Sequence, residues 1–143
     1  AGALYKLKDK LTEDFLLLNA DSIFDVDFNR FVDYHKAKGG LVTLFTHPNS
    51  HPYDSCLIIA DKNGSVEKRL AKEDERPQWY RNRVNAGLHV ISQKVLENEI
   101  TTPKIDLDRQ LLKPLAGTIN KYVGFLRDIA VFELIEGVAD AIK

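Results

Sequence analysis

Asp21 follows a short apolar run and is the residue of this sequence best placed to do chemistry. The run, residues 15–18 (Phe-Leu-Leu-Leu), has the length and composition of a strand buried on both faces, as in a parallel sheet. Ligands of open α/β sheets gather at the carboxyl ends of strands, so a carboxylate beside the small Ala20 could hold Mg²⁺ while a phosphate approaches. A structural alternative stays open, because aspartate is also a strong capping residue that would close the turn or begin the next helix.

A second group of polar side chains, His47, His51 and Asp54, lies in one loop and could bind a transition metal. Pro48 and Pro52 prevent a helix from placing the two histidines on one face. The sequence therefore favours loop packing or contact with a substrate over a metal site in this loop.

Basic residues gather between positions 68 and 83, where they alternate with acidic residues. They are Lys68, Arg69, Lys72, Arg76, Arg81 and Arg83. Such a mixture is typical of a solvated surface. The functional alternative is that a single lysine of the group reaches a phosphate of a ligand.

The segment Asn85-Ala86-Gly87 stands at the start of a predicted strand and also has two interpretations. It is either a turn residue followed by a glycine that the backbone shape requires, or an amide and a bare backbone that contact a sugar. Cys56 lies within another predicted strand, which favours a small core residue over a nucleophile.

Alternating strands and helices must position these residues. Helical spacing of apolar residues predicts a helix that begins after Asp27 and ends at Gly39, between strands at 15–18 and 41–45. This strand–helix–strand unit is typical of a crossover in an α/β fold. The other expected elements are strands at 56–60, 65–70 and 86–91, a hairpin turn at 61–64, and helices at 3–11, at 92–96 with Ser92 as its cap, and at 107–115.

The composition is that of a folded domain. Of 143 residues, 44% are hydrophobic and 29% charged, and 20 basic against 21 acidic residues give a net charge of −1, which argues against a general nucleic-acid binder. No apolar run approaches the ~20 residues of a membrane helix. A single cysteine excludes an internal disulfide and favours a cytoplasmic protein. Because the sequence lacks methionine and opens on Ala1, we expect its N-terminus to be internal to a longer protein, or to be processed or engineered.

Four motifs in this order, at residues 15–25, 42–48, 63–64 and 84–90, resemble the sugar-1-phosphate nucleotidyltransferases. The resemblance covers residues 1–115 and is strongest to the bacterial branch that activates heptose or mannose phosphate. It implies a three-layer, Rossmann-like α/β fold with a mixed, mostly parallel sheet, and a Mg²⁺-dependent reaction. An NTP, with GTP favoured, and a sugar 1-phosphate would give an NDP-sugar and pyrophosphate.

The resemblance also assigns roles to individual residues. Asp21 matches the family's metal-binding and catalytic aspartate, and Lys72 lies where the family has a lysine that contacts the substrate phosphate. The residues expected to bind substrate are Ala1 and Gly2 in a small-residue turn at the nucleotide, Asn19 beside Asp21, and Asn85, Ala86 and Gly87 at the sugar.

Several family features are missing. The first strand and the glycine-rich, arginine-containing loop that holds the triphosphate have no match, and neither has the second metal-binding aspartate. Ala20 and Ala71 replace a common glycine and a common glutamate. These differences predict a domain truncated at its N-terminus, whose exposed sheet edge would favour a homodimer. They also leave open a non-catalytic α/β remnant that only folds or oligomerises.

The C-terminal segment resembles a different family. Residues 117–127 and 132–142 are similar to the opening of a haloacid-dehalogenase-type sugar bisphosphate phosphatase, but Pro114-Leu115-Ala116 stand where its nucleophilic aspartate pair would be. The sequence thus predicts a partial nucleotidyltransferase domain at 1–115, joined to a short phosphatase-like remnant at 116–143.

Overall fold

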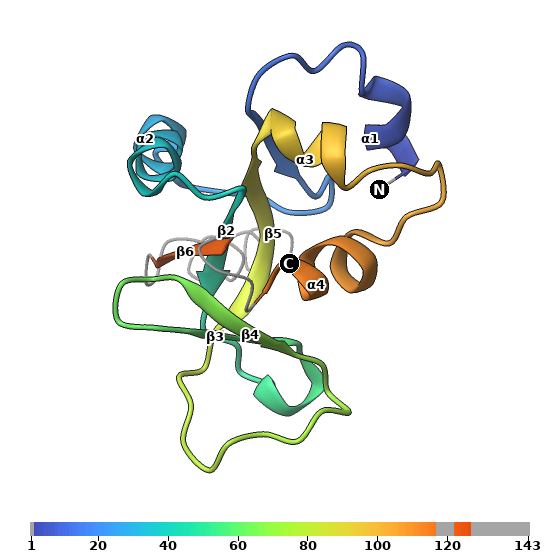
Figure 1. Cartoon of the computed structure of the whole chain (residues 1–143). Coiled ribbons are helices and arrows are strands. Elements are labelled where there is room, and N and C mark those ends of the chain that lie inside the picture. The colour runs from blue at the N-terminus through green and yellow to red at the C-terminus, as the bar shows by residue number, and fades with distance from the viewer. Residues whose placement is uncertain (1, 117–121, 127–143) are drawn as a thin grey trace, which may run out of the picture.

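A computed structural model describes residues 2–116 and 122–126 as a three-layer α/β arrangement. Figure 1 shows the sheet between helix α2 on one side and helices α1, α3 and α4 on the other. The described helices are α1 (Gly2–Leu7), α2 (Phe28–Lys38), the 3-10 turn η1 (Pro52–Asp54), α3 (Gln93–Asn98), the π-helical turn η2 (Leu107–Leu112) and α4 (Lys113–Leu115). None of the helices in these ranges is long and apolar enough to cross a bilayer.

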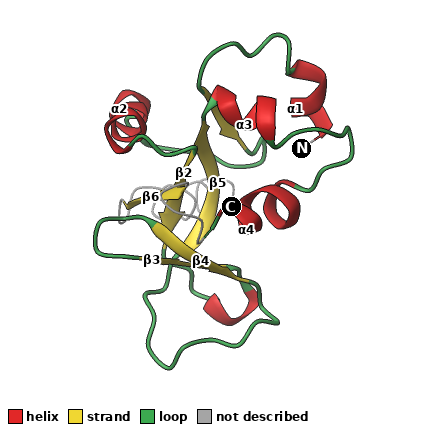
Figure 2. Cartoon of the chain, in the orientation of Figure 1, coloured by secondary structure: helices red, strands yellow, loops and turns green. Residues whose placement is uncertain are grey.

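The described strands form one sheet in which β5 is the hub. They are β1 (Phe15–Leu18), β2 (Val42–His47), β3 (Leu57–Ala60), β4 (Val66–Leu70), β5 (Val84–Ile91) and β6 (Tyr122–Leu126). The order is β4-β3-β5-β2-β6, and β1 pairs with β5 as well (Figure 2). Strand β5 is therefore paired with three others, and its side chains define the middle of the sheet.

The predicted α/β class is confirmed, but the prediction of a mostly parallel sheet is wrong. Strands β1, β2 and β3 all pair antiparallel with β5, β3 pairs antiparallel with β4, and only β2 and β6 pair in parallel among the described strands. The unit β1–α2–β2 does run strand–helix–strand with both strands in one direction. However, β5 lies between β1 and β2 and pairs antiparallel with both. The sequence of residues 15–45 could not indicate this, because β5 comes from later in the chain.

Local signals fix helix α2 and the β3–β4 hairpin. The Asp27 carboxylate accepts the N–H of Arg30 at 3.1 Å, and Gly39 ends α2 in the left-handed region with φ 66°. In the hairpin, Asp61 Oδ1 accepts the N–H groups of Asn63 and Ser65, both at 2.8 Å. The predicted helix and hairpin are both confirmed. They could be predicted because all of these bonds join residues close in sequence.

The start of helix α3 differs from the prediction. Ser92 occupies the cap position, but its side chain makes no capping hydrogen bond. Asp14 Oδ1 instead accepts the N–H of Gln93 at 3.1 Å. The cap therefore comes from a residue 79 positions away, which no local sequence signal could indicate.

The sheet buries a different hydrophobic cluster on each face. Alternate residues of a strand point to opposite faces, so Leu44 packs beneath α3 and α4 while its neighbour Phe45 packs beneath α2. Phe45 meets Phe31 of α2 edge to face, with ring centroids 5.8 Å apart. These two layers hold β5 rigidly between them.

A polar group is buried between α2 and the sheet. The His35 imidazole is 2% exposed, with Nδ1 2.8 Å from Thr43 Oγ1 and Nε2 3.5 Å from Asp14 Oδ2. Burial lowers the pKa of His35 below its ordinary value of 6.5, and the Asp14 carboxylate offsets part of that effect. The folded state thus favours the neutral imidazole.

Acidification should therefore destabilise the protein through His35. Below about pH 6.5 the unfolded chain binds a proton that the folded chain resists, so the free energy of unfolding should fall by up to about 1.4 kcal/mol by about pH 5.5. Denaturant unfolding across this range measures the effect. The variant His35→Gln should show a flatter profile, and an unchanged slope in the variant would contradict the role of His35.

The predicted phosphatase-like remnant at 116–143 lies largely outside the described residues. Within it, β6 pairs with β2 in the common sheet, from Val42 opposite Tyr122 to Thr46 opposite Leu126. The division into two parts stays a prediction.

Candidate active site

Two cavities are both lined by Cys56 and Arg69, and the first of them also lies against β5. The first, of about 350 Å³, is here named the amide cavity and is lined by Asn19, His47, Asn49, Ser55, Cys56, Arg69, Val84, Asn85, Gly87, His89 and Leu107. The second, of about 750 Å³, is named the charged cavity and is lined by Asp54, Cys56, Arg69, Ala71, Lys72, Glu73, Asp74, Asp106, Arg109 and Lys113. The two cavities share these two residues, and together they are called the cleft below.

A bulge in β5 shapes the amide cavity. Between the pairs Leu44–His89 and Thr46–Asn85, β2 advances two residues while β5 advances four. Gly87 lies in the extra stretch with φ 81°. Its N–H donates to Asn85 Oδ1 at 3.0 Å, so the side chain of Asn85 satisfies a backbone donor that the bulge removes from the ladder.

This bond also orients the other end of the Asn85 amide. With Oδ1 held by Gly87, Nδ2 lies 2.9 Å from His89 Nε2 and donates to it. Nε2 is the acceptor of this bond and so carries a lone pair. Asn85, Gly87 and His89 alternate along β5 and present a fixed set of polar groups to the cavity.

Asn19 is held against the same bulge from the end of β1. Its N–H donates to the Gly87 carbonyl at 3.0 Å. A Cβ atom added at Gly87 would come within 2.8 Å of Asn19 Cγ. Glycine is therefore favoured at position 87 by its backbone conformation, and a side chain there would also displace the Asn19 amide.

Hydrogen bonds fix the loop that forms the outer wall. Asn49 donates its N–H to Asn82 Oδ1 at 3.2 Å, and Asn82 Nδ2 returns a bond to the Asn49 carbonyl at 2.6 Å. Arg76 Nη2 donates to the carbonyls of Tyr53 and Ser55 at 3.0 and 2.9 Å. The loop is thus attached to the segment that carries Lys72.

The loop histidines do not form a metal site. His47 lines the amide cavity and donates from Nδ1 to the Pro48 carbonyl at 2.6 Å, whereas the His51 ring lies 2.9 Å from Ser50 Oγ. Asp54 belongs to the charged cavity. Across residues 2–116 and 122–126 no three histidine, cysteine, aspartate or glutamate side chains are grouped closely enough to hold a metal ion.

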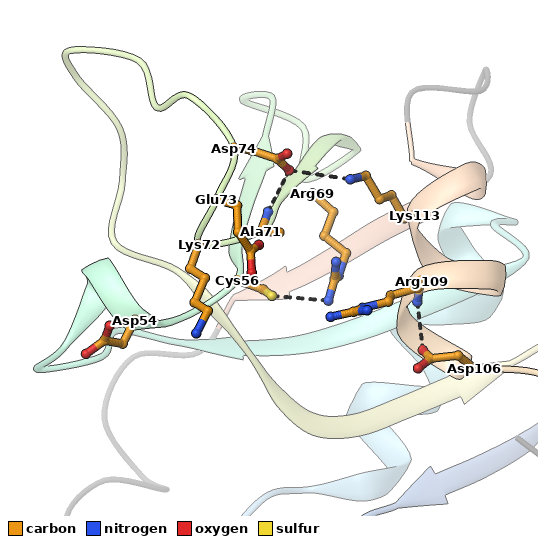
Figure 3. A pocket seen from close by; sticks show the side chains of 10 residues that line it. All are labelled: Asp54, Cys56, Arg69, Ala71, Lys72, Glu73, Asp74, Asp106, Arg109 and Lys113. Atoms are coloured by element: carbon orange, nitrogen blue, oxygen red, sulfur yellow. Dashed lines mark hydrogen bonds and ion pairs between the residues drawn. The ribbon is translucent and has the colours of Figure 1, made fainter.

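Figure 3 shows the charged cavity between the end of β4 and the helical segment 106–113. Asp74 Oδ2 accepts the N–H of Ala71 at 2.8 Å and lies 3.5 Å from Lys113 Nζ. The hydrogen bond from Ala71 is the main cause that lowers the pKa of Asp74, with Lys113 adding to it. Asp74 thereby fixes the turn from which Lys72 extends into the cavity.

Four predicted site residues line this cleft: Asn19, Asn85 and Gly87 in the amide cavity and Lys72 in the charged cavity. Asp21 does not line either half. It is exposed in the turn two residues beyond Asn19, where its Oδ1 accepts the Ser22 hydroxyl at 3.3 Å.

The other predicted residues lie elsewhere. Ala86 points to the opposite face of β5, against the core cluster around Phe31. Gly2 begins α1, where an added Cβ would lie 2.7 Å from the Pro103 carbonyl oxygen. Ala1 is outside the described residues, and the roles of all three stay predictions.

The sequence reading missed several residues of the cleft. His89 could have been found, because it continues the alternation of Asn85 and Gly87. Arg109 and Lys113 carried no signal, because only the fold brings the segment that follows α3 against β4.

Comparison with known proteins identifies the family. The sequence pattern of the family described as "Nucleotidyl transferase" matches residues 1–121. The chain belongs to this family. It is 28% identical over 142 residues to mannose-1-phosphate guanylyltransferase 1 of Arabidopsis thaliana, and 31% identical over 101 residues to mannose-1-phosphate guanyltransferase of Saccharomyces cerevisiae.

These matches cover most of this chain but a minor part of each relative. The Arabidopsis match covers 90% of this chain and 37% of the relative, and the yeast match covers 68% and 27%. The crystal structure of HddC from Yersinia pseudotuberculosis superposes with a TM-score of 0.70 at 16% identity, covering 99% of this chain and 61% of that one. This likeness shows that the two chains share a fold.

Replacing Gly87 with alanine tests the geometry of the amide cavity. Gly39→Ala is the matched control, since Gly39 also has positive φ but an added Cβ there meets no atom within 4 Å. Backbone strain alone should lower the stability of Gly39→Ala by about 1 kcal/mol, and the added clash with Asn19 should bring Gly87→Ala to about 2 kcal/mol or more. Denaturant unfolding measures both, and equal losses would contradict the close approach of Asn19.

Proposed function

We propose that this chain carries the acceptor half of a sugar-phosphate nucleotidyltransferase site and transfers a nucleotidyl group from an NTP to a sugar 1-phosphate. The observation that carries the proposal is the division of one cleft into an uncharged polar half and a charged half that share Cys56 and Arg69. Family membership supports the reaction class, and the relatives named above are guanylyltransferases of mannose 1-phosphate.

The two halves suit the two ends of a sugar phosphate. Amide, hydroxyl and imidazole groups both donate and accept hydrogen bonds, as sugar hydroxyls do, and Asn19, Asn85 and His89 supply such groups in the amide cavity. A phosphate prefers cations, and Lys72 and Arg69 line the adjoining half. A sugar in the amide cavity would direct its phosphate past Cys56 toward Lys72.

In the proposed reaction an oxygen of the sugar phosphate attacks the α-phosphorus of the nucleotide in line. The new P–O bond forms as the bond to pyrophosphate breaks, and pyrophosphate leaves with the electron pair. Lys72 would hold the acceptor phosphate by charge, and the fixed Asn85 amide would hold the sugar ring. Their contribution is positioning and charge neutralisation, which supply much of the rate in this chemistry.

We propose Mg²⁺ as the cofactor and Asp21 as the ligand this chain supplies. Mg²⁺ in nucleotide-dependent enzymes commonly takes one or two carboxylates and completes its shell with water and substrate phosphates. The exposed Asp21 carboxylate, two residues from Asn19, fits that donor set, because among the described residues it accepts a hydrogen bond only from the Ser22 hydroxyl. When bound, the ion would neutralise charge on the nucleotide phosphates.

The nucleotide is proposed to be GTP, on the strength of the guanylyltransferase relatives. Incubating the chain with Mg²⁺, mannose 1-phosphate and each NTP in turn, with pyrophosphate as the readout, tests the proposal. Pyrophosphate release that requires the sugar phosphate and is fastest with GTP is the expected result. A folded chain that binds no sugar phosphate and releases no pyrophosphate would contradict the proposal and favour the non-catalytic alternative.

Lys72→Gln should weaken the binding of mannose 1-phosphate. Loss of a charge-assisted hydrogen bond to the phosphate predicts a Kd higher by about 10- to 100-fold, measured by isothermal titration. Lys68→Gln is the control, because Lys68 is an exposed lysine nearby that does not line the cleft. An equal rise in Kd in both variants would contradict a direct contact between Lys72 and the phosphate, because it would show only the effect of removing one positive charge from the surface.

Asp21→Asn should raise the Mg²⁺ concentration needed for half-maximal pyrophosphate release. Replacing a carboxylate with a neutral amide weakens a Mg²⁺ ligand, so a shift of about 10-fold or more is expected. Asp25→Asn, a change to an exposed aspartate four residues on, should leave the Mg²⁺ dependence unchanged. A normal Mg²⁺ titration in Asp21→Asn would remove Asp21 from the proposed metal site.

A further inference from the structure

Three cationic side chains line the charged cavity, two from the end of β4 and one from the opposite wall. Arg69 belongs to β4, Lys72 follows that strand, and Arg109 belongs to η2 on the opposite wall. In Figure 3 the Arg109 guanidinium extends across the cavity toward that of Arg69, and the Lys72 ammonium lies on the other side of Cys56. Arg69 Nη2 donates to Cys56 Sγ at 3.2 Å, which holds its guanidinium at the junction with the amide cavity.

The backbone of Arg109 is fixed although its side chain is exposed. Its N–H donates to Asp106 Oδ1 at 2.8 Å, and the N–H of Asp106 donates to Gln110 Oε1 at 2.6 Å. These two bonds form a reciprocal cap on η2. The Arg109 side chain therefore extends from a backbone position that hydrogen bonds hold in place on the cavity wall.

Lys72 and Arg109 form no ion pair within the described part of the chain. Four carboxylates also line the cavity: Asp54, Glu73, Asp74 and Asp106. Asp74 is bound to Ala71 and Lys113, Asp106 accepts the backbone of Arg109, and the other two are exposed to solvent.

We propose that Arg109 is a phosphate-binding residue, which together with Lys72 and Arg69 holds the phosphate of the acceptor. Because neither Lys72 nor Arg109 is held in an ion pair within the described residues, both head groups can turn to a bound dianion, which attracts each of them. The planar guanidinium presents two parallel donors that match two phosphate oxygens, whereas Lys72 contributes a point charge. The identity of this ligand as a sugar phosphate rests on the proposed function, but the anion site rests on the cavity alone.

The arrangement also determines which end of a sugar phosphate would occupy which cavity. Arg69 lines both halves, so a phosphate held between Lys72 and Arg109 lies beside the entrance to the amide cavity. A sugar attached to that phosphate can reach Asn85 and Asn19, whereas inorganic phosphate can occupy only the charged half. Binding of the two probes should therefore depend on Arg109 in the same way.

Isothermal titration of mannose 1-phosphate, and separately of inorganic phosphate, into four forms of the chain tests this proposal. The forms are the wild type, Arg109→Gln, Arg109→Lys and Lys113→Gln. Lys113 is the matched control, because it lines the same cavity but lies 3.5 Å from Asp74, with which it forms an ion pair. Thermal unfolding of each form confirms that the fold is retained.

For both probes we expect Arg109→Gln to raise Kd by about 10-fold or more, and Arg109→Lys to give an intermediate value because it keeps the charge without the fork. Lys113→Gln should stay within about twofold of the wild type. Wild-type affinity in Arg109→Gln, or equal losses in Arg109→Gln and Lys113→Gln, would overturn the proposal, as would a wild-type chain that binds neither probe. Binding of inorganic phosphate in the expected order without binding of mannose 1-phosphate would support Arg109 and contradict the proposed function.

Discussion

The site depends on one backbone constraint, the bulge of β5 at Gly87. The left-handed conformation of this residue turns its N–H to the Asn85 side chain and its carbonyl to the N–H of Asn19. Those two bonds fix the Asn85 amide and bring the end of β1 against the middle of β5. A side chain at position 87 would strain this backbone conformation and displace the Asn19 amide from its place against the bulge.

The central position of β5 makes this local feature effective. Paired with β1, β2 and β3 and buried on both faces, the strand cannot shift to relieve the bulge. Such rigidity matters for binding, because prepositioned groups lose little entropy when a ligand arrives. The charged cavity is assembled differently, from a turn held by Asp74 and a helical segment that packs beside it. The cleft thus joins a rigid hydrogen-bonding half to a half whose long cationic side chains can adjust.

Short-range features of the fold could be read from the sequence, and long-range ones could not. Helix α2, with Asp27 at its start and Gly39 at its end, and the hairpin after Asp61 depend on bonds between near neighbours. The cap of α3 by Asp14 and the insertion of β5 between β1 and β2 join distant segments, so periodicity gave no indication of either. The mostly parallel sheet was predicted wrongly for that reason.

The same distinction applies to the site. Asn85 and Gly87 lie on one strand, and their spacing places them on one face, so motif reasoning found them and could have added His89. Motif reasoning also selected Lys72, but nothing in its neighbourhood could indicate that Arg109 lies across the same cavity. Asp21 lies three residues beyond the end of β1 and is exposed outside the lining of both cavities, so its role in a metal site stays a prediction.

The central claim is that the two cavities act as one binding site for a sugar phosphate. Mapping backbone and side-chain NMR shifts on addition of mannose 1-phosphate, with mannose and inorganic phosphate as separate titrations, tests it most directly. The account predicts that mannose 1-phosphate perturbs Asn85, Gly87, Lys72 and Arg109 together with one common Kd, whereas inorganic phosphate perturbs only the last two. If mannose 1-phosphate shifted the signals of one cavity only, or those of both cavities with different Kd values, the result would contradict this claim.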